Sequence, residues 1–338
     1  MAELKFEFDG DAFSAPFDMP EYPEISDGYL PPNVHIHVDY GRHERRDDLA
    51  PTIPKFDACD IYIPEAAGYD EDWVRTTRRL ARGDARLMKR LQGLSLYDPD
   101  TFEAAELDLM FGSEKPMLFV DGNAGQTTNA YQDDEIVEIA KASGFASFNE
   151  AIAYMFKLDF DTTRDEVNRD RIMLENLGPK IGRLIAMMPR LQVKDEVLVL
   201  MRLGTAHYRV FDHLSKSPAS RDQVSAETVN YRTQVAIVNR TEEDLTSRII
   251  ENQKVPRQLI IEHTIVNGIH QIFPVTATDP DELTRQIAIK NTLTKNIIAS
   301  GAEVAALIIG RIGNNCAQLG DHEFLQKHYS EAQSSDHE

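Results

Sequence analysis

Residues 197–207 read Val-Leu-Val-Leu-Met-Arg-Leu-Gly-Thr-Ala-His, and this stretch says most about the fold. Its apolar first half, Val197–Met201, is bounded by a turn signal and predicts a buried strand. Gly204 then permits a sharp turn, and His207 follows just past the carboxyl end of the strand. In open α/β sheets this edge is where ligands bind and catalysis takes place.

Three strand candidates upstream also lead to polar side chains. They cover 34–38, 60–63 and 117–120, and they lead to His43, Glu65 and Asp121 respectively. Helical segments separate the strand candidates, which predicts βαβ crossovers and an α/β fold: a mainly parallel sheet flanked by helices, with an appended C-terminal helical module. Because parallel strands share one direction, we expect these side chains to gather with His207 at one edge.

Two segments between the strands have helical character. Residues 70–91 carry apolar side chains at near-helical spacing, which predicts an amphipathic helix. Residues 133–188 predict more helix, in at least two or three pieces that break near Gly144, Asp161 and Gly178.

By composition the chain divides into four parts. Residues 1–32 combine acids and aromatics with five prolines, which exclude a continuous helix and predict an extended arm. The α/β core is expected at 33–215, a helical module at 216–320 and a polar tail at 321–338. Asp279 opens a long apolar stripe in the module, and such a stripe suits a homo-oligomer formed through the C-terminal helices.

Charge and cysteine usage limit the function classes. The net charge is −20, from 36 basic and 56 acidic residues, which argues against nucleic acid and anionic membrane surfaces as partners. The two cysteines, Cys59 and Cys316, form no C-x-x-C pair, so neither a zinc ribbon nor a disulfide framework is indicated. The sequence contains no signal peptide and no run of about 18 apolar residues, so a cytoplasmic location is expected.

His43, Glu65 and His207 have side chains that bind divalent transition metals such as zinc, manganese, cobalt or iron. A site with three protein ligands leaves a position open for water, whose pKa the metal lowers enough to yield hydroxide near neutral pH. Each residue alone is better explained by capping a strand or meeting solvent. Their joint position after predicted strands favours a shared metal site.

His35 and His37 form a His-x-His on the first strand, with Asp39 two residues on. Residues two apart on a strand share a face, so both imidazoles are placed to chelate one ion. Amidohydrolase-type barrels begin their metal sites in this way, but the chain lacks the eight strand–helix repeats of such a barrel. The alternative to a metal site is that both histidines are hydrogen-bonded to protein groups near a sheet face.

Arg169 opens the helical segment Arg-Asp-Arg-Ile-Met at 169–173. Because residues four apart share a helix face, the spacing allows Arg169 to point inward with Met173 packed beneath it. An inward arginine holds a carboxylate in place or binds an anionic substrate group. A solvated helix face is the alternative.

The segment 75–90 carries seven basic residues in an acidic chain, namely Arg75, Arg78, Arg79, Arg82, Arg86, Lys89 and Arg90. Such a run either forms a solvated helix face or docks against the acidic arm or a partner. The sequence assigns it no function.

Four elements within 33–215 resemble those of the TraB/Tiki/ChaN/erythromycin-esterase-like superfamily, in the family's order. They are Gly41-Arg42-His43, Glu65, Arg169-Asp170-Arg171-Ile172-Met173 and Gly204-Thr205-Ala206-His207. The resemblance implies an α/β fold in which two Gly-x-x-His elements and the Glu line one cleft; similar proteins include metal-dependent proteases, macrolide-ester hydrolases and haem-binding proteins. The first element has one residue between Gly41 and His43 where the family pattern has two, which leaves His37 as an alternative first ligand.

Together these observations predict a metal-dependent hydrolase, a peptidase among the options, that acts on small-molecule or peptide substrates. The metal would be bound by His43, Glu65 and His207, and Arg169 would steady a carboxylate or the developing oxyanion. One alternative is a protein in which the same histidines ligate haem. The other is a non-catalytic regulatory or scaffold protein that acts through its helical module.

Overall fold

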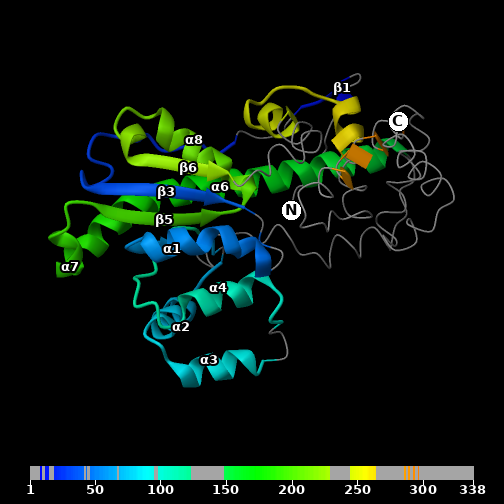
Figure 1. Ribbon diagram of the computed structural model, residues 1–338. Coiled ribbons are helices and arrows are strands. Elements are labelled where there is room, and N and C mark those ends of the chain that lie inside the picture. The colour runs from blue at the N-terminus through cyan, green and yellow to red at the C-terminus, as the bar shows by residue number, and fades with distance from the viewer. Residues whose placement is uncertain are drawn as a thin grey trace. The chain divides into compact units, whose positions relative to one another are not determined.

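The computed structural model of the chain contains two compact units, whose elements are labelled in Figure 1. The first unit comprises Met1–Met19, Asn129–Arg164 and Asn230–Glu338, and the second comprises Pro20–Thr128 and Asp165–Val229. The residues whose structure is described are 8–9, 12–14, 19–41, 43, 46–66, 68–94, 98–122, 148–228, 244–263, 285, 286, 288, 289, 292, 293 and 296. All the residues expected to form the site belong to the second unit.

The second unit is built on a four-stranded parallel sheet, which confirms an α/β fold with a mainly parallel sheet. The strands, in the spatial order β4-β5-β3-β6, are β4 (Ile61–Ile63), β5 (Val197–Leu203), β3 (Val34–Tyr40) and β6 (Val224–Thr228). β3 pairs with β5 along its whole length, and with β6 on its other side. Because all four strands run the same way, their carboxyl ends lie at one edge.

Two expectations about the strands are wrong. Residues 117–120 form no strand of their own: Met117 makes a single parallel bridge to Tyr62, and the carbonyl of Phe119 accepts a hydrogen bond from Lys180 Nζ at 2.9 Å. The sheet also extends past residue 215, because β6 completes the free edge of β3. The β6 sequence Val-Ser-Ala-Glu-Thr has no apolar run, so the pattern that predicts the other strands does not reveal it.

Helices cover both faces of this sheet (Figure 1). The second half of α6 (Phe148–Met187) and α8 (Tyr208–Lys216) pack on one face, and α1 (Ile53–Ala58) and α4 (Phe102–Met110) pack on the other. The remaining elements of the second unit are α2 (Glu71–Ala81), α3 (Ala85–Gln92), α7 (Pro189–Gln192) and the 3-10 turns η1 (Arg46–Thr52), η2 (Thr205–His207) and η3 (Arg221–Gln223).

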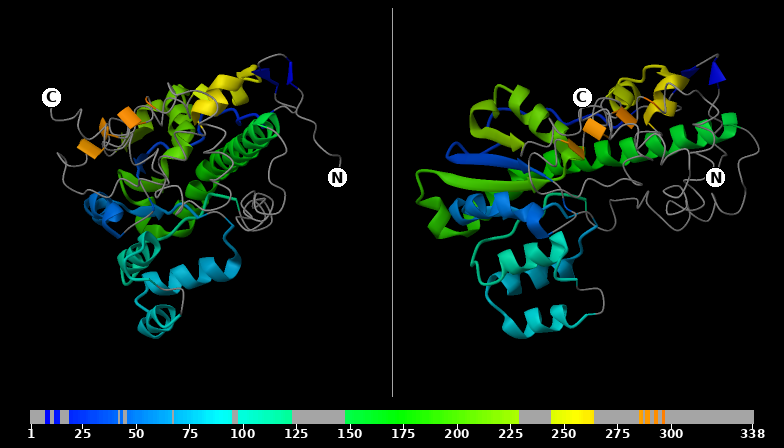
Figure 2. Two further views of the ribbon diagram at one scale, coloured as in Figure 1. Left: turned by 90° about the vertical axis from the view of Figure 1, so that its right-hand side faces the viewer. Right: turned by 45° about the vertical axis from the view of Figure 1, so that its right-hand side comes forward.

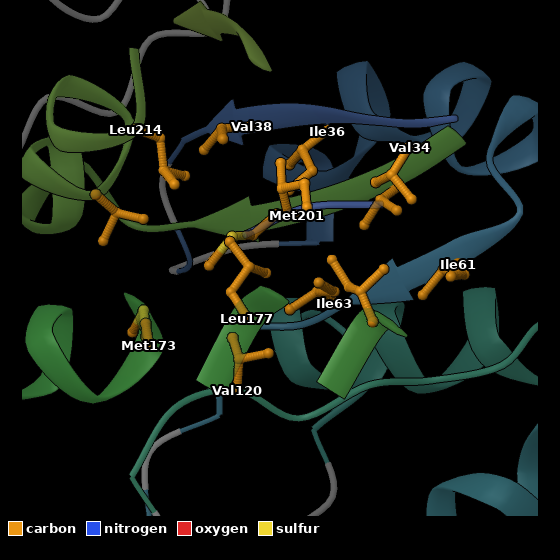
Figure 3. Packing of buried hydrophobic residues seen from close by; sticks show 14 of the residues in the cluster. Val34, Ile36, Val38, Ile61, Ile63, Val120, Met173, Leu177, Met201 and Leu214 are labelled. Atoms are coloured by element: carbon orange, nitrogen blue, oxygen red, sulfur yellow. The ribbon is translucent and has the colours of Figure 1, made fainter. Parts of the chain in front are cut away.

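The larger hydrophobic core lies between the sheet and α6. Figure 3 shows Ile36 and Met201 of the sheet facing Met173 and Leu177 of the helix, and all four side chains are buried. Along β3 every second side chain joins this core, and the intervening His35 lies on the opposite face, where it is exposed. Close packing of this kind fixes the strand ends relative to α6.

The segment 70–91 forms two helices instead of one, α2 and α3. Gly83, at the junction, has a positive φ of 78°, which ends the first helix at little steric cost. Asp84 then caps the second helix by accepting a hydrogen bond from the backbone N–H of Leu87 at 3.0 Å.

Within its described range α6 is continuous for 40 residues, so the breaks expected near Asp161 and Gly178 are absent. The expected break near Gly144 lies outside the described residues. Gly178 serves close packing: a Cβ at this position would lie 2.2 Å from the carbonyl oxygen of Tyr29. The Tyr29 hydroxyl also donates a hydrogen bond to the carbonyl of Leu174, so the 20–32 segment is tied to α6 at this glycine.

The described part of the first unit contains a small antiparallel sheet of β1 (Phe8–Asp9), β2 (Ala12–Phe13) and β7 (Val255–Pro256). Most of the expected helical module at 216–320, including Asp279, lies outside the described residues, as does the whole 321–338 tail. None of the helices in the described ranges has the length and apolar content needed to span a membrane.

The role of Gly178 gives a stability prediction. Alanine normally stabilises a helix interior relative to glycine by up to about 1 kcal/mol. Gly178→Ala is expected instead to destabilise the protein by about 1–3 kcal/mol, because the new methyl group meets backbone and not a movable side chain. Urea unfolding of parent and variant measures the difference.

Gly182→Ala is the matched control on the same helix. Its Cβ would have only Pro31 Cγ nearby, at 3.9 Å, which is an ordinary contact. This variant is expected to be as stable as the parent or more so. Equal stability of the two alanine variants would contradict the packing role of Gly178.

Candidate functional site

The carboxyl edge of the sheet gathers five expected side chains into one cluster. His43, Glu65 and His207 follow β3, β4 and β5, and Asp121 follows the extended Met117 segment. Arg169 reaches the same place from α6. Each of the five contacts at least one other member through a polar atom.

Glu65 is the centre of this cluster. Its Oε1 accepts a hydrogen bond from Arg169 Nη2 at 3.0 Å and lies 3.2 Å from His207 Nε2. Its Oε2 accepts from the backbone N–H of Gly204 and lies 3.5 Å from His43 Nδ1. A Cβ on residue 204 would come within 3.1 Å of Oε2, so the glycine is what allows this close approach.

His207 is held between two carboxylates. Its Nε2 faces Glu65, and its Nδ1 lies 2.5 Å from Asp170 Oδ1. Asp170 is fully buried, and the Tyr22 hydroxyl donates to its second oxygen at 3.3 Å. Both ring nitrogens of His207 therefore have partners, and the ring orientation is fixed from both sides.

Arg169 points toward the sheet edge and is bonded there. Its Nη2 donates to Asp121 Oδ2 at 2.5 Å as well as to Glu65, and its Nε lies 3.2 Å from the same Asp121 oxygen. Asp121 also accepts from the backbone N–H of Gly122 at 2.7 Å. No described residue accepts a hydrogen bond from Arg169 Nη1.

His43 lies at the edge of the cluster and stacks on Phe102 of α4, with ring centroids 4.5 Å apart and an interplanar angle of 22°. Its Nδ1 faces Glu65. Its Nε2 is shielded from solvent and has no hydrogen-bond partner among the described residues. His43 is thus the imidazole of the cluster with a nitrogen left unpaired.

The cluster has an inner and an outer layer. The side chains of Asp121, Asp170 and His207 are at most 1% exposed. Those of Arg169, Glu65 and His43 are 16%, 17% and 24% exposed. The groups that reach the surface are therefore held from below by buried partners, an arrangement that fixes a reactive site more firmly than loops do.

The pKa values follow from these contacts. Burial alone would lower the pKa of His207, but the Glu65 and Asp170 carboxylates outweigh it and raise the pKa to about 10. Burial alone would raise the pKa of Glu65, but His207, His43 and Arg169 hold it well below its usual range. For His43, burial lowers the pKa from its ordinary value, despite the opposing charge of Glu65. At neutral pH His207 is therefore charged, Glu65 is ionised and His43 is neutral.

A separate buried ion pair joins the neighbouring strands β3 and β5. Arg202 of β5 is only 1% exposed and donates to Asp39 Oδ2 at 3.1 Å. Gly41 leaves room for this arginine, because a Cβ there would lie 2.2 Å from the Arg202 guanidinium. The glycine of the expected Gly41-Arg42-His43 element therefore serves packing, and Arg42 itself lies outside the described residues.

A divalent metal does not fit the three expected ligands as they stand. Both nitrogens of His207 and both oxygens of Glu65 are engaged with protein groups, which leaves His43 Nε2 as the unpaired donor. No group of three or more His, Cys, Asp or Glu residues in the described part of the chain is arranged to hold a metal ion. Metal binding would require Glu65 and His207 to give up present partners, so the metal site stays a prediction.

His37, the alternative first ligand, does not join the cluster. It lies within β3, where its Nδ1 is 3.0 Å from Ser225 Oγ of β6 and its Nε2 is 3.9 Å from Glu227 Oε2. His35, on the same face, lies 3.8 Å from Glu196. The two imidazoles thus have separate partners along the sheet.

Sequence reasoning missed Asp170, Tyr22 and Phe102. Asp170 stands beside Arg169, and its position two residues before the buried Ile172 is the signal that could have indicated it. Tyr22 and Phe102 lie far from the cluster in sequence, and only the fold brings them near.

Comparison of the chain with protein-family models, with curated proteins and with solved structures finds no match. The superfamily resemblance therefore stays a prediction, and the geometry of the cluster carries the functional argument.

The charge state of His207 predicts how stability depends on pH. Because its pKa is raised in the folded state, the stabilisation is fully present below the ordinary value of 6.5 and is lost as the pH rises toward about 10. We expect stability to fall by a few kcal/mol over this interval. Urea unfolding between pH 6.5 and 10 measures the decrease.

Histidine-selective ¹⁵N NMR provides an independent measurement that needs no variant. At pH 8 the two His207 nitrogens should both give the shifts of protonated nitrogens. A neutral tautomer of His207 at that pH would show that the two carboxylates do not hold the proton.

Proposed function

We propose that the chain is a hydrolase in which His43 acts as general base on a water molecule and Glu65 orients the base. The observation that carries this proposal is the pairing of the His43 ring: Nδ1 faces a carboxylate and Nε2 has no hydrogen-bond partner among the described residues. A neutral imidazole with one nitrogen oriented and the other unpaired is the form that accepts a proton.

In the proposed reaction His43 Nε2 removes a proton from water, and the water oxygen attacks a carbonyl carbon. Glu65 stabilises the imidazolium that forms, and its fixed position comes from the Gly204 N–H and His207. His43 then returns the proton to the leaving group, so the proton balance closes. Since Nε2 is shielded from solvent, a local opening at the sheet edge has to admit the water.

Arg169 supplies the positive charge for the developing oxyanion. Its Nε and Nη2 are fixed by Asp121 and Glu65, and its Nη1 faces no acceptor among the described residues. A preorganised donor of this kind stabilises charge in the transition state without reorganising during the reaction. The proposed substrates are small esters or amides, with peptides as one class of amide.

The metal and haem predictions make different demands on the same residues. A metal-assisted hydrolase would need His207 and Glu65 to exchange protein partners for the ion. A haem iron would need a histidine nitrogen; among the described imidazoles of the cluster, His43 Nε2 has no hydrogen-bond partner, and His37 Nε2 in β3 has none either. The hydrolase that works through His43 and Glu65 keeps the present partners of Glu65 and His207, which favours it over the metal-dependent one, and it uses the pairing of the His43 ring with Glu65, which haem ligation does not need.

The experiment compares hydrolysis of p-nitrophenyl acetate, p-nitrophenyl butyrate and a fluorogenic peptide mixture by parent and His43→Gln protein. Loss of the general base is expected to lower kcat/KM by about 10²–10⁴-fold. The matched control is His35→Gln on β3, whose exposed ring lies 3.8 Å from Glu196, outside the cluster. The control should retain parental activity.

Metal content and visible absorption of the same preparations distinguish the alternatives. The proposal expects activity that survives a chelator in protein without stoichiometric metal. Activity that disappears with the chelator and returns with zinc or manganese would instead support the metal-dependent hydrolase. Equal activity of His43→Gln and parent would contradict the role of His43.

A further inference from the structure

α2 and α3 carry a strongly basic surface on the helical group that they form with α4. Figures 1 and 2 show these three helices together, on the far side of α1 from the strands. The basic face, as we call it, consists of Arg75, Arg78, Arg79, Arg82, Arg86, Lys89 and Arg90, and all seven residues are exposed.

The apolar stripes of the two helices explain why the basic residues point outward. Leu80 of α2 packs with Leu87 and Met88 of α3, and all three are buried. The arginines and the lysine recur at spacings of three and four on the other side of each helix. Packing of the hairpin therefore presents both basic stripes to solvent.

Most of the basic face has no partner among the described residues. Arg75 pairs with Asp72 at 3.1 Å, and Arg79 pairs with Asp84 at 2.6 Å. The other five residues make no side-chain hydrogen bond or ion pair with the described part of the chain; they are Arg78, Arg82, Arg86, Lys89 and Arg90.

Part of this arrangement works against the stability of the isolated chain. Like charges three or four residues apart on a helix repel by a few tenths of a kcal/mol per pair, and Arg86 and Arg90 form such a pair. Arg86 is also the second residue of α3, where the positive end of the helix dipole disfavours a cation. The helix dipole favours Arg78 and Arg79 in the last turn of α2, and Lys89 and Arg90 in the last turn of α3. It does not explain Arg75 or Arg86.

We propose that the basic face is a docking surface for an acidic segment of a partner polypeptide. An anionic partner would relieve the repulsion among the five unpaired cations. Six of the seven residues are arginines, whose planar guanidinium binds carboxylates through two parallel hydrogen bonds. The partner segment would carry rows of Asp and Glu side chains that match the two basic stripes, and the basic face would recognise it by these rows.

The charge of the rest of the chain favours a polypeptide over a nucleic acid. The chain has a net charge of −20 although it contains this basic face, so its other surfaces repel a long polyanion. At physiological salt the attraction of the face acts over roughly 8 Å. A short acidic segment lying along α2 and α3 stays within that range, whereas a long phosphate backbone passes beyond it.

Fluorescence anisotropy with the full chain tests the proposal, with a labelled oligoglutamate of 15 residues as the probe. The parent protein should bind in a salt-dependent way. The double variant Arg82→Glu/Arg86→Glu should bind at least about ten-fold more weakly, because two attractive contacts become repulsive.

Lys216→Glu/Arg221→Glu is the matched control, because it changes the net charge equally and both residues are exposed, at 73% and 62%. Binding by this variant should stay within about two-fold of the parent, as expected for charges outside the docking surface. Absence of binding by the parent, or an equal loss in both variants, would overturn the proposal. Tighter binding of a 15-nucleotide single-stranded DNA than of the peptide would overturn the choice of partner.

Discussion

The cluster at the carboxyl edge of the sheet depends on the contacts of one carboxylate. Glu65 accepts hydrogen bonds from Arg169 of α6 and from the backbone N–H of Gly204 after β5. It also lies within ion-pair distance of the imidazoles of His43 and His207. It therefore ties the ends of β3, β4 and β5 to α6 at one point. The sheet and its hydrophobic core place these segments close together, and the Glu65 contacts set the distances between their polar atoms.

Burial of the charged side chains costs free energy, and it also fixes their positions. Moving a charged group out of water costs several kcal/mol, and partners must offset that cost. Each buried charge of the cluster has them: His207 has two carboxylates, and the carboxylate of Asp121 has the Arg169 guanidinium and the N–H of Gly122. Removing one group would leave another charge buried and unpaired, so the outer groups have little freedom to move. A fixed Glu65 is what makes His43 an oriented base in the proposed hydrolase.

The sequence predicts the polar residues at the carboxyl edge of the sheet better than it predicts the strands and helices that hold them there. The apolar run of β5 and the position of His207 after it were enough to predict a buried strand with a polar residue at its end. β6 was missed because its apolar and polar residues are mixed, so periodicity carries no signal. Gly178 was misjudged because its close contact with Tyr29 comes from a segment about 150 residues away. Asp170 was missed because a buried carboxylate cannot be recognised until its imidazole partner is placed.

A double-mutant cycle between Glu65 and His207 measures the central interaction most directly. Unfolding free energies of the parent, Glu65→Gln, His207→Gln and the double variant give the coupling energy of the pair, free of other effects of each substitution. A coupling energy of about 1.5 kcal/mol or more is expected for a buried, charged pair at 3.2 Å. Effects that add within about 0.5 kcal/mol would show that Glu65 and His207 are independent, and would contradict a cluster organised around this carboxylate.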